Sequence, residues 1–213
     1  MKPWDEVESA GLSRRRLLGA AAGVPLLGLA VPAHAGGQVE EPLADAVRTA
    51  LAAAVSVDGA PPKPVFEHLE HRLTYLRWLG SMSEKLKRWA QEARARIEFL
   101  ETVWYESKRA GLEPALVLGL IHVESGFRKY AISSAGARGY MQVMPFWSRL
   151  IGDGDASKLF HTQTNLRFGC VILRHYLDME KGNLFLALGR YNGSRGRAPY
   201  PTAVLGHRTR YLA

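Results

Sequence analysis

The sequence has one cysteine, Cys170, among its 213 residues. An internal disulfide is therefore impossible, and the fold must depend on its hydrophobic core. The seven histidines include no His-x-x-x-His pair, and no Cys-x-x-Cys pair is present, so we expect no metal site and no cofactor. Cys170 has no partnered His motif that would make it a nucleophile, and we expect it to be a small buried hydrophobe.

Long apolar runs are also missing. The run at residues 17–31 is broken by Pro25 and by several glycines, and a membrane-spanning helix needs about 20 apolar residues. Ser-Arg-Arg-Arg precedes this run at 13–16, and Ala-His-Ala follows it at 33–35. This pattern is typical of a twin-arginine export signal. We expect residues 1–35 to be cleaved, Gly36 to start the mature chain, and the protein to reach the periplasm. An uncleaved anchor is the alternative.

Alternating strand patterns are absent, whereas helical periodicity is frequent. With 47% hydrophobic and 23% charged residues, the chain can bury one core. We expect an all-α protein with helices at residues 43–55, 65–79, 83–109, 114–124, 144–151, 165–179 and 183–191. Gly80 and Ser81 would separate the second helix from the third, and Asn165 and Asn183 would be N-caps.

Three prolines at positions 61, 62 and 64 interrupt the chain after the first expected helix. We therefore predict a helix and a Pro-rich linker at residues 36–64 and a helical domain at residues 65–213.

The net charge of +8 favours an acidic partner. Both nucleic acid and an anionic polymer such as the cell wall fit a basic surface. The export signal argues against nucleic acid. Basic residues between positions 63 and 109 alternate with apolar ones, which usually marks a solvated helix face.

A carboxylate lies on the apolar face of the helix expected at residues 114–124. Pro114 suits a first helical turn and Gly126 suits the position just beyond a helix end. Leu116, Leu120 and Glu124 follow at four-residue steps, so they share one face. Burial and the helix dipole would both raise the pKa of Glu124, as a general acid requires. The alternative is a structural Glu that is solvated or paired with an Arg.

Four ordered motifs surround or follow Glu124. They are Glu-Ser-Gly-Phe at 124–127, Ala-x-Ser-x-x-Gly-Ala-x-Gly-x-Met-Gln-x-Met-Pro at 131–145, Asn165 with Gly169, and Gly-Arg-Tyr-Asn-Gly at 189–193. Together they resemble the catalytic core of lytic transglycosylases of the soluble, SLT-domain type in the lysozyme-like superfamily, over residues 103–192. Tyr140 stands where the family usually has Leu, and Gly189 where it has Ala. The family's Glu before a C-terminal Thr-Arg and Tyr cannot be assigned here.

The resemblance implies a lysozyme-like fold and peptidoglycan glycan strands as substrate. Glu124 would protonate the bond between N-acetylmuramic acid and N-acetylglucosamine and then deprotonate the C6 hydroxyl, which closes a 1,6-anhydro ring. Tyr191 would orient or polarise the groups around Glu124. The residues implied to line the groove or to hold the site in shape are Ser125, Met141, Gln142, Asn165 and Asn192. Core filling by Met141, capping by Asn165 and a merely buried Tyr191 are the alternatives.

Acidic residues are scarce near Glu124. Between positions 114 and 175 the only acidic residues besides Glu124 are Asp153 and Asp155, and their stretch of sequence is typical of a turn. Ordinary glycosidases use two carboxylates. A single acid suits the transglycosylase reaction. A hydrolase of the goose-lysozyme kind would need a positioned water and usually a second acid. A non-catalytic wall-binding protein remains a third possibility, and the sequence identifies no protein partner.

Overall fold

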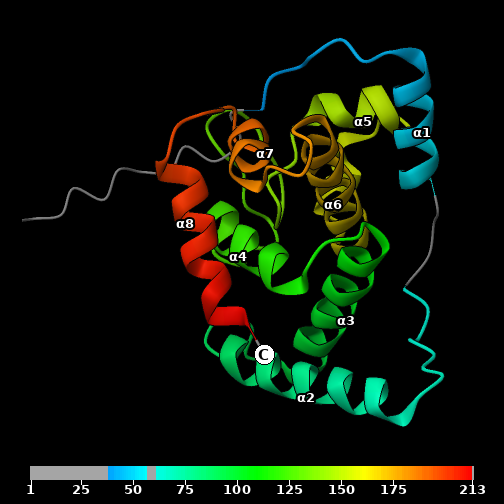
Figure 1. Cartoon of the computed structure of the whole chain (residues 1–213), viewed down its shortest axis with the longest axis vertical. Helices are drawn as coiled ribbons and strands as arrows, with labels where there is room; N and C mark the ends of the chain where they lie inside the picture. The colour runs from blue at the N-terminus through cyan, green and yellow to red at the C-terminus, as the bar shows by residue number, and fades with distance from the viewer. Residues whose placement is uncertain (1–37, 57–60, 213) are drawn as a thin grey trace, which may run out of the picture. The chain divides into compact units, whose positions relative to one another are not determined.

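Helices build the part of the chain that this computed structural model describes, residues 38–56 and 61–212 (Figure 1). These residues belong to one unit that spans Pro32–Ala213, and no strand is assigned within them, which confirms the all-α class. The helices are α1 (Asp45–Val55), α2 (Leu69–Leu86), α3 (Ala93–Arg109), α4 (Pro114–Ser125), α5 (Pro145–Ile151), α6 (Thr162–Met179), α7 (Leu184–Tyr191) and α8 (Pro199–Arg208), with 3₁₀ turns η1 (Ala156–Phe160) and η2 (Thr209–Tyr211).

The predicted export signal at residues 1–35 lies outside the described residues. Its cleavage and the boundary drawn at residue 64 stay predictions. In the described residues no helix combines the length and the apolar character that a membrane span requires.

The helix break expected at Gly80 and Ser81 is wrong. Helix α2 continues through both residues to Leu86, and the break falls at residues 87–92. Gly80 costs helix stability, but buried Trp78 and Met82 hold the turns on either side against the core. Helix α3 begins where the Glu92 side chain accepts hydrogen bonds from the first backbone N–H groups.

The predicted cap at Asn165 is also wrong, whereas the cap at Asn183 is confirmed. Helix α6 begins at Thr162, so Asn165 lies inside its first turn. Asn183 accepts a hydrogen bond from the backbone N–H of Leu186 at 3.1 Å. Cys170 is buried in α6, and burial raises the pKa of its thiol, as expected for a buried hydrophobe.

Helix α8 is the α-helix that the sequence analysis missed. Pro199 and Pro201 near its start argue against a helix in the sequence. Pro199 is nevertheless tolerated at the first helical position, because the first N–H groups of a helix have no intrahelical partner. Tyr200 and Val204, one turn apart, are its buried residues together with Pro201.

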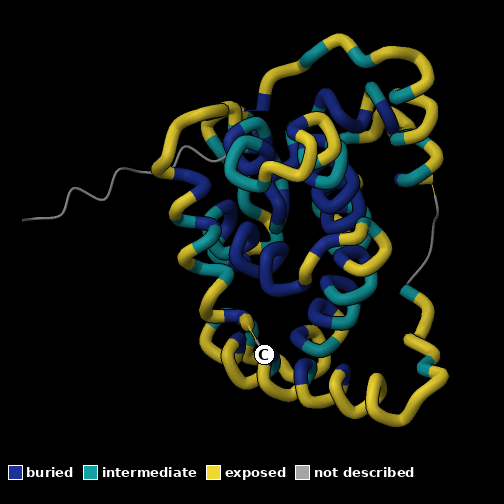
Figure 2. Tube along the Cα trace, viewed as in Figure 1, coloured by how far each residue is buried: buried dark blue, intermediate teal, exposed yellow. Residues whose placement is uncertain are grey.

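Helix α4 lies at the centre of the helical assembly, with α8 along one side and α3 on another (Figure 1). All its residues except His122 and Val123 are buried, as the dark tube in Figure 2 shows. Gly119 allows α8 to come close, because a Cβ there would lie 2.7 Å from the Arg208 backbone nitrogen. The C-terminal turn of α4, which carries Glu124, is therefore held in the interior.

Candidate active site

Glu124 occupies the last turn of α4 with 5% of its surface exposed. Its Oε1 accepts a hydrogen bond from the Tyr200 hydroxyl, and its buried Oε2 has no hydrogen-bond partner among the described residues. Burial raises the pKa of Glu124 from its ordinary value of 4.5 to about 8, and the Tyr200 hydrogen bond opposes that rise. Glu124 is therefore protonated at neutral pH and can donate that proton.

Gly126 ends α4 in the left-handed region, with φ 55°. This is the position that the sequence assigned to it. The turn directs the chain away immediately after Glu124, so the loop that carries the second motif begins beside the acid.

Tyr191, in the last turn of α7, is fully buried in the same region. Its hydroxyl donates a hydrogen bond of 2.8 Å to the carbonyl oxygen of Met141. Burial raises the pKa of Tyr191 well above 10, and the negative charge of Glu124 raises it further. The fold thus brings Tyr191 into electrostatic range of Glu124, with its hydroxyl protonated.

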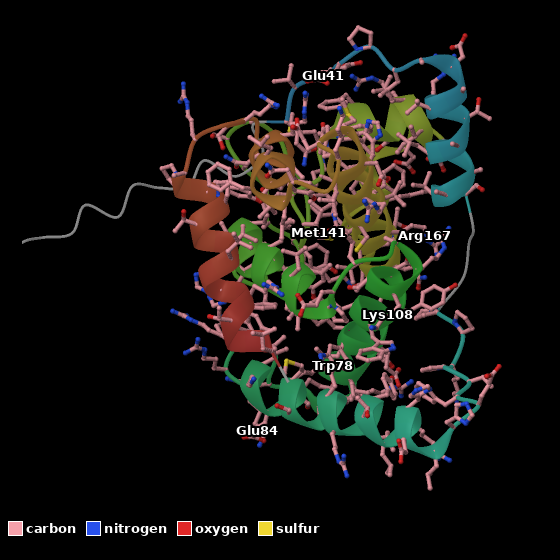
Figure 3. All side chains as sticks on the ribbon, viewed as in Figure 1. Glu41, Trp78, Glu84, Lys108, Met141 and Arg167 are labelled. Carbon is pink, nitrogen blue, oxygen red and sulfur yellow. The ribbon has the colours of Figure 1, made fainter. Side chains whose placement is uncertain are left out.

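Met141 is held in place by the Asn-x-x-x-Gly motif of α6. Its backbone N–H donates to Asn165 Oδ1 at 2.8 Å, and Asn165 Nδ2 donates to the carbonyls of Arg138 and Leu159. Gly169, one turn later, leaves room for the Met141 side chain, because a Cβ there would lie 2.7 Å from Met141 Cβ. Figure 3 labels Met141 in the interior of the assembly. Asn165 and Met141 are buried supports of the site.

Gln142 and Ser125 also use their polar atoms internally. Gln142 is buried with φ 48°, and its Nε2 donates to the carbonyls of Gly139 at 2.9 Å and Ala131 at 3.1 Å. Ser125 Oγ donates to the Ile121 carbonyl at 3.2 Å. Both residues thereby fix the backbone around Glu124.

Asn192 differs from the other predicted binding residues because it keeps an unused acceptor. Its Nδ2 donates to Ser194 Oγ at 3.1 Å, while its buried Oδ1 has no hydrogen-bond partner in the described part of the chain. Of the five residues predicted to bind glycan, Asn192 is thus the one that is only half-buried. A direct role in binding stays a prediction for all five.

Tyr200 is the site residue that sequence reasoning missed. Burial raises its pKa well above 10, with further contributions from Glu124, so its hydroxyl stays protonated and donates to the carboxyl. A helix start at Pro199 followed by apolar residues at Tyr200 and Val204 was the available signal.

Asp153 and Asp155 are exposed and held in local turns. Asp153 pairs with Lys158, and Asp155 caps η1 by accepting from the Ser157 N–H at 2.9 Å. Hydrogen bonds lower the pKa of both carboxyls, so neither aspartate can keep a proton near neutral pH. The turn predicted for them is confirmed.

The other buried acids are paired with arginines. Glu106 binds Arg167 at 2.9 Å, and the pairs with Arg195 and Arg190 lower the pKa of Glu180 to about 2. Across residues 38–56 and 61–212, no three His, Cys, Asp or Glu side chains come together as a metal site would require. Among the buried carboxyls of the described residues, Glu124 is therefore the one that has no arginine partner and whose pKa burial raises.

Such a helical domain, with one protonated acid and two tyrosine hydroxyls in its interior, has the parts of a general-acid site. Residues 101–201 match the family model of the Transglycosylase SLT domain. This part of the chain is thus similar to the family that the ordered motifs indicated. The match includes Glu124 and Tyr191, and it also includes Tyr200, beyond the expected core at residues 103–192.

Relatives with similar sequences carry transglycosylase names. The chain is 40% identical over 100 residues to the membrane-bound lytic murein transglycosylase C of Actinobacillus pleuropneumoniae serotype 5b, an alignment that covers 46% of this chain and 26% of that protein. It is 31% identical over 102 residues to the transglycosylase of Enterobacteria phage PRD1, covering 48% of this chain and 37% of the phage protein. The chain thus spans 26% and 37% of the length of these two relatives.

One solved structure is also similar. It is an inactive mutant of the lytic transglycosylase Slt from Pseudomonas aeruginosa, at 23% identity and a TM-score of 0.47, covering 66% of this chain and 29% of that one.

Proposed function

We propose that this protein is an exported peptidoglycan lytic transglycosylase. It would cleave the β-1,4 bond between N-acetylmuramic acid and N-acetylglucosamine and leave 1,6-anhydro-muramic ends. The observation that carries the proposal is the state of Glu124, a buried carboxyl whose pKa is raised to about 8 within the residues that match the SLT domain. The names of the relatives support the same activity.

In the first step Glu124 donates its proton to the glycosidic oxygen. The C1–O bond breaks, the N-acetylglucosamine part leaves as an alcohol, and positive charge develops at C1 of the muramic residue. The N-acetyl group of the substrate can share that charge, as in substrate-assisted glycosidases. Glu124 is now a carboxylate, and the Tyr200 hydroxyl, which hydrogen-bonds to it, stabilises that charged form.

In the second step the Glu124 carboxylate acts as a base. It takes the proton of the muramic C6 hydroxyl while the C6 oxygen attacks C1. The ring closes, no water is consumed, and Glu124 recovers its proton. One carboxyl thus serves as acid and then as base, and a second carboxylate is not needed.

The scarcity of acids near Glu124 favours this reaction over hydrolysis. Tyr200 is the polar partner of Glu124, and no second carboxyl contributes to its raised pKa among the described residues. A hydrolase would need a base that positions a water molecule. Glu106 and Glu180, the other buried acids, form ion pairs with arginines.

The remaining predicted residues have supporting roles in this proposal. Tyr191 stabilises charge in the transition state, and Asn192 offers its free Oδ1 to the glycan. Ser125, Met141, Gln142 and Asn165 hold the walls of the site through the hydrogen bonds described above. The basic net charge assists association with an anionic cell wall.

Glu124→Gln tests the proposal directly, because the amide keeps the size of the side chain but cannot donate the proton. We expect release of soluble muropeptides from purified sacculi to fall at least about 100-fold. Mass spectrometry of the wild-type products should find 1,6-anhydro ends. Reducing ends would indicate a hydrolase, and undiminished release by the variant would refute the role of Glu124. Asp153→Asn is the matched control and should retain activity.

Export through the twin-arginine route has its own test. Replacing Arg14 and Arg15 by Lys should leave the protein in the cytoplasm, since that route depends on the arginine pair. Cell fractionation followed by immunoblotting measures the result. Normal export of the double variant would contradict the predicted route without affecting the proposed chemistry.

A further inference from the structure

The loop that follows Glu124 carries positive charge without any acidic residue. No Asp or Glu occurs at residues 125–152. The cationic residues of this stretch are Arg128, Lys129, Arg138 and Arg149. Arg149 pairs with Glu40 at 3.5 Å, but as far as the described residues extend neither Arg128 nor Lys129 pairs with a carboxylate. Uncompensated positive charge therefore begins at residue 128, close to the acid in the sequence.

Two large apolar side chains of the same loop are exposed to solvent. Tyr130 is 70% exposed and Ile132 is 65% exposed. The centroid of the Tyr130 ring lies 5.3 Å from Lys129 Nζ and 6.0 Å from the centroid of the Phe160 ring in η1. Residues 128–132 line a hollow of about 400 Å³. Arg128, Lys129, Tyr130 and Ile132 thus form one cationic and apolar surface, the 128–132 surface.

Hydrogen bonds attach the 128–132 surface to the residues around Glu124. Arg128 Nε donates to the carbonyl oxygen of Ser125 at 2.9 Å. The carbonyl oxygen of Ala131 accepts from Gln142 Nε2 at 3.1 Å. Ser125 and Gln142 both belong to the sequence motifs of the site. The backbone of the 128–132 surface is therefore held beside the site, while its exposed side chains extend into solvent.

The proposed substrate offers a ligand of matching chemistry. The muramic acid residues of peptidoglycan carry short peptides, and the carboxylates of these peptides are ionised at neutral pH. A glycan strand bound at Glu124 brings such a peptide next to the site. The terminal nitrogens of Arg128, which the contact with Ser125 does not use, can bind a carboxylate through two parallel hydrogen bonds. The Tyr130 ring can pack against the alkyl parts of the same peptide.

We propose that the 128–132 surface binds the acidic peptide attached to the muramic acid at the cleaved bond. Arg128 and Lys129 bind the carboxylates of the peptide, and Tyr130 and Ile132 pack against its alkyl groups. This inference rests on the proposed function and deepens it, because it names the part of the substrate that the protein recognises outside the cleaved bond. It adds residues that differ from the five predicted to bind glycan.

Calorimetric titration of the full chain with soluble glycan strands tests the inference, with Glu124→Gln as the background that prevents cleavage. One sample of strands keeps its peptides, and an amidase has removed them from the other. Lys129→Gln and Tyr130→Ala should each raise Kd about 3-fold to 5-fold for the peptide-bearing strands and leave Kd for the peptide-free strands unchanged. Lys108→Gln is the matched control and should leave both Kd values unchanged, because Lys108 also lies over an aromatic ring, that of Trp104, but on α3 (Figure 3).

Two results would overturn the inference. Equal losses on both kinds of strand would mean that the surface contacts the glycan itself, and unchanged Kd values in both variants would mean that it binds no peptide. Kinetics with Glu124 intact separate the inference from the proposed function: Lys129→Gln should raise KM for peptide-bearing strands about 3-fold to 5-fold with kcat unchanged. A wild-type protein that releases no muropeptides would refute the proposed function, whereas the Kd values would still decide whether the surface binds the peptide.

Discussion

The state of Glu124 results from two opposing influences at a single residue. Burial in the last turn of α4 raises its pKa, whereas the hydrogen bond from Tyr200 favours the charged form and lowers it. The resulting value of about 8 keeps the proton at neutral pH and still allows its release. Tyr200 therefore lowers the pKa of the same carboxyl whose pKa burial raises.

Tyr200→Phe should move the pH dependence of activity in a defined direction. The proposed reaction needs protonated Glu124, so kcat/KM should fall as the pH rises through the pKa of about 8. Without the hydrogen bond to its charged form, Glu124 should hold its proton more tightly. We expect the alkaline limb of the kcat/KM profile to move up by about one pH unit.

Tyr211→Phe is a suitable control for that experiment. Tyr211 is also buried, but its hydroxyl lies 2.7 Å from His122 Nδ1. The alkaline limb of this variant should match the wild type. A limb in Tyr200→Phe that stays in place or moves down would contradict the role given to Tyr200.

At the scale of elements, close contact between α4 and α8 brings Tyr200 to Glu124. Gly119 makes this contact possible, because the backbone of α8 occupies the space that a side chain would need. Gly189 likewise meets backbone, whereas Gly169 leaves space for the Met141 side chain. A Cβ at Gly189 would lie 2.9 Å from Arg195 Cα, which explains why this chain has Gly where the family usually has Ala.

Two glycine substitutions should therefore have opposite effects on stability. Gly119→Ala should destabilise the protein by about 1–3 kcal/mol, because α8 must move away from α4. Gly80→Ala should stabilise it by about 0.5–1 kcal/mol, because Gly80 lies inside α2 and nothing beyond the nearby backbone of its own helix lies within 4 Å of its Cβ position. Urea unfolding at equilibrium measures both changes. Equal stability of the two variants would contradict this account of the contact.

At the scale of the whole molecule, Glu124 links stability to pH. Its pKa is higher in the folded protein than its ordinary value of 4.5. The folded state therefore binds the proton more tightly, and this stabilisation is complete below pH 4.5 and lost as the pH rises towards 8.

Glu124→Gln removes this titration, so its stability relative to the wild type should increase with pH. We expect the difference in unfolding free energy to grow between pH 4.5 and pH 8, by at most about 1.4 kcal/mol per pH unit. Thermal unfolding of both proteins at several pH values measures this without any substrate. Parallel stability profiles would mean that Glu124 is not buried as described.

The sequence by itself determined the helical class and the positions of most helices, because periodicity and end signals are local. Pro114 and Gly126 set the ends of α4, and Asn183 set the start of α7. The four-residue spacing that ends at Glu124 also placed the acid on a buried face. These features depend on residues within a few positions of one another.

Only the tertiary structure decided what surrounds that acid. Tyr200 reaches Glu124 from α8, and the Tyr191 hydroxyl reaches the Met141 carbonyl from α7. The continuation of α2 through Gly80 likewise follows from the core packing of Trp78 and Met82, which outweighs the low helix propensity of glycine. Local pattern cannot encode such contacts, because they depend on which distant helices meet and how closely they approach.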